Sequence, residues 1–335
     1  MFRYIVRRLI GAVFVVFIIS LVTFSLQFLA IHVGGGSPAY LFLGKAPSAE
    51  QVAAFEKQWG LDQSFLHQYV DYVKGIFTGR TLGDGTVGSE RDCPAPCLGY
   101  SFQYQAPVTQ LIKDAFPVTF SLAIGAAVLW LVTGVTIGVI SALKKGSLAD
   151  RSAMVFALAG VSLPVYFTGL ILLYVFVYSL HWLQPPNYVS FTTDPVAWAQ
   201  NLILPWITIA FGTAALYARF TRANMLETLN EDYIRTAVSK GLPHRTVIRR
   251  HAMRSALTPV VTIFGMDLGF LLGGAILTER TFSLPGLGYL TVNAIARQDL
   301  QVVLGVTIVA AIFIVMANLV VDVVYGLVDP RVRFN

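Results

Sequence analysis

Residues 219–259 read RFTRANMLETLNEDYIRTAVSKGLPHRTVIRRHAMRSALTP, a basic, soluble-looking stretch between two apolar ones. A segment this polar is excluded from the hydrocarbon of a bilayer, and its arginines favour the cytoplasmic face of a membrane. We therefore expect this stretch to be a cytoplasmic loop between two apolar parts of the chain. It is also a candidate docking surface for a soluble partner.

The composition of the whole chain indicates an integral membrane protein. Of its 335 residues, 56% are hydrophobic and only 13% are charged, and the mean hydropathy is +0.67. So little polar surface cannot cover a water-soluble globule of this size. The net charge of +6 is distributed by loop, which indicates orientation in a bilayer rather than binding to nucleic acid.

Six stretches are long enough to cross a hydrocarbon core of about 30 Å as helices. They are residues 9–31, 117–143, 152–180, 202–217, 259–278 and 302–325. Most of the 24 Lys and Arg residues then lie on one side, in 1–8, 144–151, 219–254 and 331–333. The positive-inside rule therefore predicts that both termini are cytoplasmic. We expect the first stretch to be a retained helix, because no small-residue cleavage site follows it.

These spans define the expected organisation of the chain. Residues 1–31 form the cytoplasmic N-terminus and first span, and 32–116 form an exterior region too long for a simple connector. The remaining spans occupy 117–325 and include the cytoplasmic loop 218–258, and a cytoplasmic tail follows at 326–335.

Two short amphipathic helices are predicted in the exterior region. Ser48 and Gln51 form a capping box before the first, which Gly60 can close. The second ends near Gly75. We expect them to cap the outer mouth of the membrane part, with these apolar residues facing inward: Val52, Phe55 and Trp59 in the first, and Phe65, Leu66, Tyr69, Val70 and Val73 in the second.

Cys93 and Cys97 lie in the exterior region as Cys-Pro-Ala-Pro-Cys. Two thiols are too few for a structural zinc site, and the compartment is expected to be oxidising. A local disulfide is the favoured interpretation. A pair of free thiols with no role is the alternative, because spacing alone does not establish the bond geometry.

Three polar residues lie inside the apolar spans. Asp267 falls near the middle of the fifth, and Asn318 and Asp322 lie one turn apart on the sixth. A charge there is costly and usually faces a cavity or a partner, so a translocation pathway and a structural hydrogen bond are both open. Small residues on the fifth span allow helices to approach closely: Gly265, Gly269, Gly273 and Gly274.

No nucleotide, metal or catalytic site is expected in this chain. Gly44-Lys45 is followed by Ala46 and lacks the upstream glycine of a phosphate loop. His244 and His251 are more typical of surface histidines than of metal ligands. Any energy for transport must therefore come from a partner.

The basic loop is predicted to form two helices. Thr221 is a candidate N-cap, Gly241 ends the first run, and Pro243 suits the first turn of the next helix. Such a helix pair can insert into a cleft on a motor subunit and move with it. The alternative is a solvated basic loop that contacts lipid phosphates.

Taken together, several segments resemble the permease subunits of ATP-binding-cassette importers, in the branch for dipeptides and oligopeptides. The segments are MFRYIVRRL (1–9), WGLDQ (59–63), LGYS (98–101), PVT (117–119), RTAVSKG (235–241), ERTFSLPGLG (279–288) and DPRVR (329–333). The resemblance implies an all-α membrane protein of six transmembrane helices, similar to type I importers, in the bacterial cytoplasmic membrane. Residues 81–97 look inserted relative to the family.

The loop departs from the general pattern of the superfamily. Arg235-Thr236-Ala237 stands where that pattern has Glu-Ala-Ala, and only Ala237 and Gly241 match it literally. The peptide branch has a similarly altered loop. The resemblance implies that the loop couples to an ATPase through Arg235, Thr236, Ala237, Lys240, Gly241, His251 and Arg254.

The resemblance also implies a set of partners. These are a homologous second permease, two cytoplasmic ATP-binding subunits that use ATP and Mg, an extracytoplasmic peptide-binding protein, and membrane lipid. No cofactor is expected in this chain. Glu279, Pro285 and Gly286 are expected at the outer rim, where they gate the mouth or meet the binding protein.

Three other functions remain open at this point. An ion-coupled secondary transporter would carry a proton on Asp267, although the chain shows no inverted repeat. A scaffold without transport is a second reading. A permease of the same kind for glutathione or a nickel chelate is the third.

Overall fold

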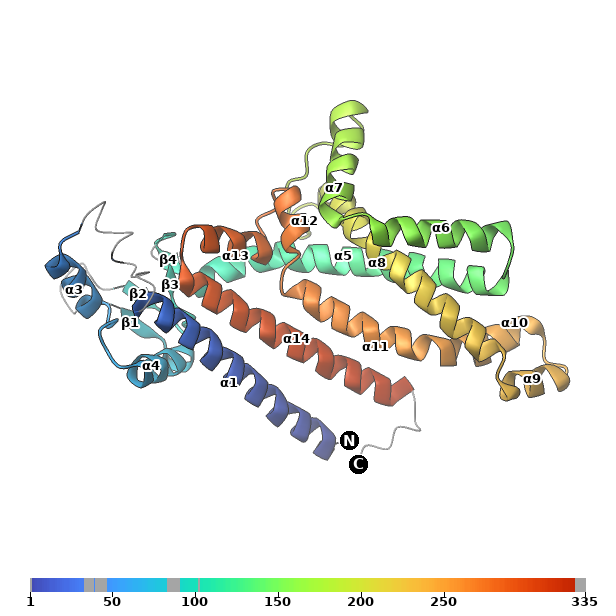
Figure 1. The fold of residues 1–335 in the computed structure, drawn as a ribbon, viewed down its shortest axis with the longest axis horizontal. Helices are drawn as coiled ribbons and strands as arrows, with labels where there is room; N and C mark the ends of the chain where they lie inside the picture. Colours follow the sequence, from blue (N-terminus) through green and yellow to red (C-terminus); the bar gives the residue numbers. More distant parts are fainter. Residues whose placement is uncertain (1, 33–38, 40–46, 83–90, 102, 329–335) are drawn as a thin grey trace.

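The computed structural model describes residues 2–32, 39, 47–82, 91–101 and 103–328. Within these residues, five helical stretches are long and apolar enough to cross a membrane, or six with one bent pair counted as a span. The expectation of an all-α membrane protein is confirmed. The long helices lie along one another in a single bundle (Figure 1): α1 (Phe2–His32), α5 (Val108–Leu143), α8 (Pro195–Leu229), α11 (Met253–Leu272) and α14 (Leu300–Val328).

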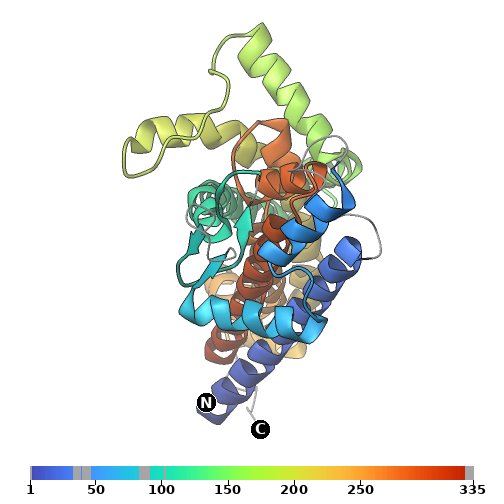
Figure 2. The same ribbon diagram turned by 90° about the vertical axis from the view of Figure 1, so that its left-hand side faces the viewer.

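The third span is not the straight helix that its apolar run predicts. It consists of α6 (Leu148–Ser162), α7 (Val165–Leu173) and the π-helical η1 (Tyr174–Ser179), with a 101° bend between α6 and the rest. Pro164 causes the break, because it has no N–H and forces the preceding residue out of the helical region. Leu163 is extended, with φ −90° and ψ 126°. As a result α7 points away from the bundle (Figures 1 and 2).

The fourth span is longer than predicted. Asp194 caps α8 by accepting from the N–H groups of Val196 and Ala197, and the helix then continues to Leu229. Thr221 is buried inside α8, so its assignment as an N-cap is wrong. The apolar run ends near Tyr217, but the helix continues to Leu229 because one face still packs on α5.

Small residues allow the helices to pack closely. A Cβ on Gly134 of α5 would lie 2.9 Å from the carbonyl oxygen of Ala214 of α8. On α11, a Cβ on Gly269 would lie 2.7 Å from the Cβ of Ala317 of α14. Part of the predicted line of small residues thus forms the contact between α11 and α14.

Short elements gather at the end of the bundle opposite α9 and α10 (Figure 1). Their bounds are α3 (Ala49–Gln58), α4 (Phe65–Thr78), β1 (Arg80–Leu82), β2 (Arg91–Cys93), β3 (Tyr100–Ser101) and β4 (Ala106–Pro107). Strand β1 pairs antiparallel with β2, and β3 with β4. The capping box of Ser48 and Gln51 is confirmed at the start of α3.

The helix α4 packs against α1 through part of its predicted apolar face. Phe65 and Tyr69 contact Phe24, whereas Leu66 and Val70 are exposed. The helix ends at Thr78. It therefore continues beyond Gly75, near which its end is predicted.

The structure joins Cys93 to Cys97 by a disulfide. The N–H of Cys97 donates to the carbonyl of Gly75, so the bridged turn is fixed against α4. Of the apparent insertion 81–97, residues 83–90 lie outside the described part of the chain.

Candidate functional site: a basic hairpin, a buried polar pair and an outer knot

The basic loop forms a helical hairpin at one end of the bundle. After α8 ends at Leu229, α9 (Asp232–Ser239) turns back, and Gly241 terminates it with a φ of +75°. Then α10 (His244–Thr246) follows Pro243 and continues as the π-helical η2 (Val247–Ala252) into α11. Figure 1 shows α9 and α10 projecting beyond the long helices. The predicted end at Gly241 is confirmed, and Pro243, which is predicted in the first turn of the next helix, is its N-cap residue.

An apolar cluster holds the hairpin against the bundle. Ile234 and Ala237 of α9 are buried against Met225 of α8 and against Val247 and Ala252 of η2. Four of the predicted coupling residues, Arg235, Thr236, Lys240 and Gly241, are exposed on the outside of the same hairpin, as is Arg254 at the start of α11, while Ala237 is buried and His251 is half-buried. The hairpin therefore combines an anchored inner face with an accessible, mainly basic outer face.

A partly buried ion pair lies beside the hairpin, and sequence reasoning missed it. The carboxylate of Asp150, at the start of α6, accepts from Nε of Arg222 at 2.7 Å and from Nη2 at 2.9 Å. The N–H of Gly146 and the hydroxyl of Ser141 also donate to it. This bidentate geometry fixes α6 and the turn before it to α8. In the sequence, Asp150 looks like an ordinary acidic residue in the first turn of a helix. Its position beside a predicted cytoplasmic turn is the only sign of an ion pair.

The intramembrane Asp267 is half-buried and paired. The hydroxyl of Tyr217 on α8 donates to its Oδ2 at 2.7 Å. Trp130 lies beside Tyr217, with ring centroids 6.3 Å apart. The pair joins α11 to α8 and leaves the other carboxylate oxygen available for a further donor.

Among the described residues, no contact joins the other predicted pathway residues to the pair of Tyr217 and Asp267. Asn318 is exposed on α14. Asp322 lies in the same helix, but its side chain is outside the described part of the structure.

Glu279 is the centre of a hydrogen-bonded knot. It lies in α12 (Ile276–Thr281), is 0% exposed, and accepts at Oε1 from the hydroxyl of Thr119 on α5 at 2.7 Å. Its Oε2 accepts from the N–H of Tyr289 in α13 (Leu287–Ala296) at 2.7 Å. Thr119 in turn accepts from the N–H of Leu287 at 2.8 Å. Burial raises the pKa of Glu279, and these hydrogen bonds oppose that rise.

Glu279, which is expected at the outer rim, is buried within this turn and not exposed on it. The side chain faces inward, where three donors converge on it: the hydroxyl of Thr119 and the N–H groups of Tyr289 and Ala275. Gly286 is required there, since a Cβ at this position would lie 2.5 Å from the carboxyl carbon of Glu279. Pro285, by contrast, is exposed.

No group of three His, Cys, Asp or Glu side chains that could hold a metal occurs among the described residues. The features that remain are an anchored hairpin, a polar pair between spans and a knotted outer turn.

Comparison with known proteins identifies the kind of membrane protein. The sequence matches the family described as binding-protein-dependent transport system inner membrane component over residues 134–334, and the N-terminal region of such components over 1–123. It is 34% identical to the glutathione transport system permease protein GsiC of Escherichia coli K12, over all of both chains. It is 36% identical to a putative peptide transport system permease protein of Brucella abortus, over 99% of each chain. The chain therefore belongs to the inner membrane components of binding-protein-dependent transport systems, the permease subunits of ATP-binding-cassette importers, in which separate subunits hydrolyse ATP.

Proposed function

We propose that this permease imports short peptides, with the hairpin of α9, α10 and η2 as its coupling element. The observation that carries the proposal is the construction of the hairpin, in which Ile234 and Ala237 are anchored while Arg235, Thr236 and Lys240 remain accessible. A soluble subunit bound to this outer face moves α8 and α11 with it. The basic side chains favour a partner surface with acidic groups.

The remaining subunits follow from this role. Two cytoplasmic ATPases hold the hairpin of this chain and that of a homologous second permease, and a binding protein delivers the cargo from outside. Both termini then face the cytoplasm. Membership in this family disfavours the ion-coupled secondary transporter as a reading of Asp267.

The coupling role is tested with a matched pair of glycines. Gly241 and Gly146 both have positive φ, +75° and +81°, and a Cβ added to either meets nothing within 4 Å. Gly241→Trp and Gly146→Trp therefore carry similar backbone strain but only the first lies on the hairpin. In vesicles containing the assembled transporter, we expect Gly241→Trp to reduce ATP-driven uptake at least tenfold more than Gly146→Trp, at about equal subunit assembly. Equal uptake by the two variants contradicts coupling through this face.

A peptide cargo is favoured because the loop resembles the peptide branch and one relative is named a peptide permease. Glutathione is the second candidate, because another relative is named for it and glutathione is itself a tripeptide. Competition between a dipeptide, a pentapeptide and glutathione for uptake by the complete system distinguishes them. Inhibition by glutathione alone would transfer the assignment to the second candidate.

We also propose that Asp267 lines the pathway, because its pairing with Tyr217 leaves acceptor capacity between two spans. Asp267→Asn keeps an acceptor for the tyrosine hydroxyl and removes the charge. The expected result is slower peptide uptake with unchanged subunit assembly. Normal uptake assigns Asp267 a structural hydrogen bond only.

A further inference from the structure

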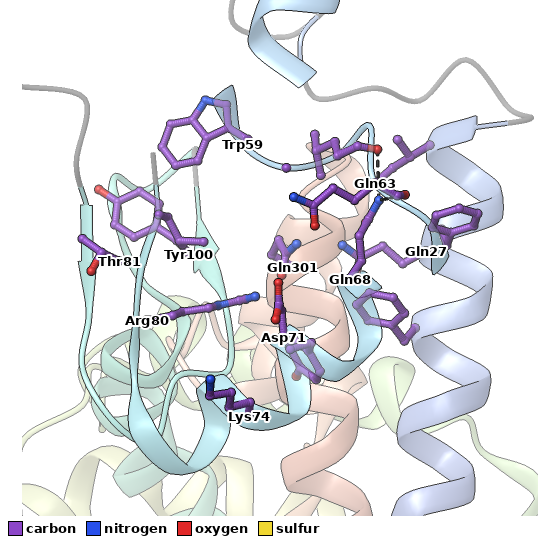
Figure 3. Close-up of a pocket in the computed structure, with 18 of the residues that line it drawn as sticks. Gln27, Trp59, Gln63, Gln68, Asp71, Lys74, Arg80, Thr81, Tyr100 and Gln301 are labelled. Carbon is purple, nitrogen blue, oxygen red and sulfur yellow. Dashed lines mark hydrogen bonds between the residues drawn. The ribbon is translucent and has the colours of Figure 1, made fainter. Parts of the chain in front are cut away.

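A cavity of about 560 Å³ lies at the end of the bundle opposite the hairpin. Its walls are the last turns of α1, one side of α4, the connection between α3 and α4, strand β1 and the first turn of α14 (Figure 3). The coupling hairpin, the pair of Tyr217 and Asp267 and the knot around Glu279 contribute no residue to it. This cavity is therefore separate from the sites described above.

Two glutamine side chains in its wall have buried acceptors without donors. Gln27 of α1 is 8% exposed, and its Oε1 has no hydrogen-bond partner among the described residues. Oε1 of Gln301 on α14 is also buried and has no hydrogen-bond partner among the described residues. A buried acceptor without a partner costs free energy, so the site favours a ligand with several N–H donors.

Charged side chains of both signs lie around the same cavity. Lys57, Lys74 and Arg80 contribute cations, and Asp71 contributes a carboxylate. Arg80 is held in place: its Nε donates to Sγ of Cys97 at 3.4 Å, and its guanidinium carbon lies 5.5 Å from the ring centroid of Tyr72. Figure 3 shows Arg80, Asp71 and Gln301 converging on the middle of the cavity. The set suits a ligand that carries an anionic group and a primary ammonium.

The depth of the cavity places it at the surface of the bilayer. The span of α1 from Val6 to His32 has 27 residues, which is about 40 Å of helix and exceeds a hydrocarbon core of about 30 Å. Gln27, Phe28 and Ile31 are in its last turns, within the layer of lipid headgroups. On the opposite face of the same turns, Leu26 and Leu29 are exposed, as is typical of a lipid contact.

The helix α4 has the character of an interfacial helix at the same level. It runs across the view in Figure 2, over the end of the bundle. Leu66, Val70 and Phe77 are exposed on it, and Phe77 is 77% accessible, while Gln68 and Asp71 line the cavity. An amphipathic helix of this kind lies in the plane of a membrane surface with its apolar side in the acyl boundary.

We propose that this cavity binds the headgroup of a phospholipid with a primary amine, such as phosphatidylethanolamine. The phosphate is bound by Arg80 and Lys74, and the ammonium donates to the carboxylate of Asp71 and to Oε1 of Gln27. The acyl chains leave along the exposed apolar faces of α1 and α4. The proposal does not depend on the cargo or on the coupling hairpin.

Native mass spectrometry of the delipidated, assembled transporter tests the site. Three probes are titrated: phosphatidylethanolamine, phosphatidylcholine with the same acyl chains, and free phosphoethanolamine. Phosphatidylcholine has no N–H donor and loses every hydrogen bond that the ammonium makes, so we expect it to bind at least about tenfold more weakly, because the loss of a single charge-assisted hydrogen bond already has that effect. Free phosphoethanolamine is expected not to displace the lipid at equal concentration.

Variants locate the bound lipid. Gln27→Leu and Lys74→Met are each expected to weaken phosphatidylethanolamine binding about five- to tenfold. Gln27→Leu removes a buried, unpartnered acceptor and Lys74 is exposed, so both variants retain the fold, which a melting curve checks. The control is Lys113→Met, an exposed lysine near the start of α5 that does not line the cavity.

Three results overturn the proposal. The first is equal binding of the two lipids. The second is equal binding by Gln27→Leu, Lys74→Met and Lys113→Met. The third is displacement of the lipid by free phosphoethanolamine or by a dipeptide at equal concentration, which assigns the cavity to a soluble zwitterion.

Discussion

At the scale of single residues, Thr119 connects the outer turn to the bundle. Its hydroxyl donates to Glu279 and accepts from the N–H of Leu287, so one side chain on α5 satisfies polar groups from α12 and α13. All of these groups are buried. The turn is therefore held by this hydroxyl in addition to its buried apolar side chains, such as Phe282 and Leu284.

Thr119→Val is expected to lower the free energy of unfolding by about 1–3 kcal/mol, because it leaves a buried N–H and part of a buried carboxylate without partners. Thr119→Ser keeps the hydroxyl and loses one methyl group, at a cost of about 1 kcal/mol. Denaturation of the purified protein in detergent measures both. A larger loss for the serine variant would show that packing, not hydrogen bonding, fixes the turn.

A pH dependence is expected from Asp299, just before α14. Burial raises the pKa of this carboxyl, and hydrogen bonds from Ser101 and two backbone N–H groups oppose the rise. A raised pKa in the folded state means that the folded protein binds the proton more tightly than the unfolded chain. Its contribution to stability is thus complete below the unfolded pKa of about 3.9 and is lost as the pH rises through the folded pKa.

The measurement is the melting temperature between pH 4 and pH 8, for which we expect a fall with rising pH. Asp299→Asn, which keeps an acceptor for Ser101, is expected to flatten that slope. Asp62→Asn, at an exposed position in the same outer region, serves as the comparison. If the melting temperatures of all three proteins fall with pH at the same slope, Asp299 is not the source of the pH dependence.

At the scale of elements, the ion pair of Asp150 and Arg222 joins α6 to α8. Asp150→Asn and Arg222→Met are each expected to lower the melting temperature, since the first leaves the partly buried Arg222, and the second the buried Asp150, without its counter-charge. The double variant should be no less stable than the worse single one, because both groups then lose their interaction together. Additive losses would show that the two residues act independently.

The elements also show what sequence reasoning could predict. Long apolar runs, the capping box at Ser48 and the break at Gly241 are local signals, and the structure contains the corresponding helices. The bend at Pro164 is local too, but a continuous apolar run concealed it. The continuation of α8 past Thr221 depends on packing against α5, which a hydropathy pattern does not contain.

The candidate site was less predictable for the same reason. The loop residues could be found by resemblance, but Asp150 and Arg222 are 72 positions apart, and Thr119 and Glu279 are 160 apart. Single side chains at such separations give no periodic signal. Only the fold shows that Glu279 faces inward and that Gln27 and Gln301 line the same cavity.

At the scale of the whole molecule, the described start of α1, the end of α8 and the hairpin lie towards one end of the bundle, and α3 and α4 lie at the other (Figure 1). We expect a single cysteine at Ser239, in a variant with Cys93 and Cys97 replaced by serine, to resist an impermeant maleimide in intact cells. A cysteine at the exposed Lys57 of α3 should react. Labelling of Ser239→Cys from outside would invert the proposed orientation.

The helix α8 runs without a break from its cap at Asp194 to Leu229, beside the hairpin. Its 35 residues give a rod of about 52 Å. Such a rod resists shortening because its turns are hydrogen-bonded apart from the bond that Pro205 cannot donate, so a push at one end is transmitted as tilt. A rotation of about 5° about its foot displaces the far end by about 4.5 Å, close to the rise of one helical turn. A small rotation of α8 at its hairpin end can therefore open a gap of several ångströms at its opposite end.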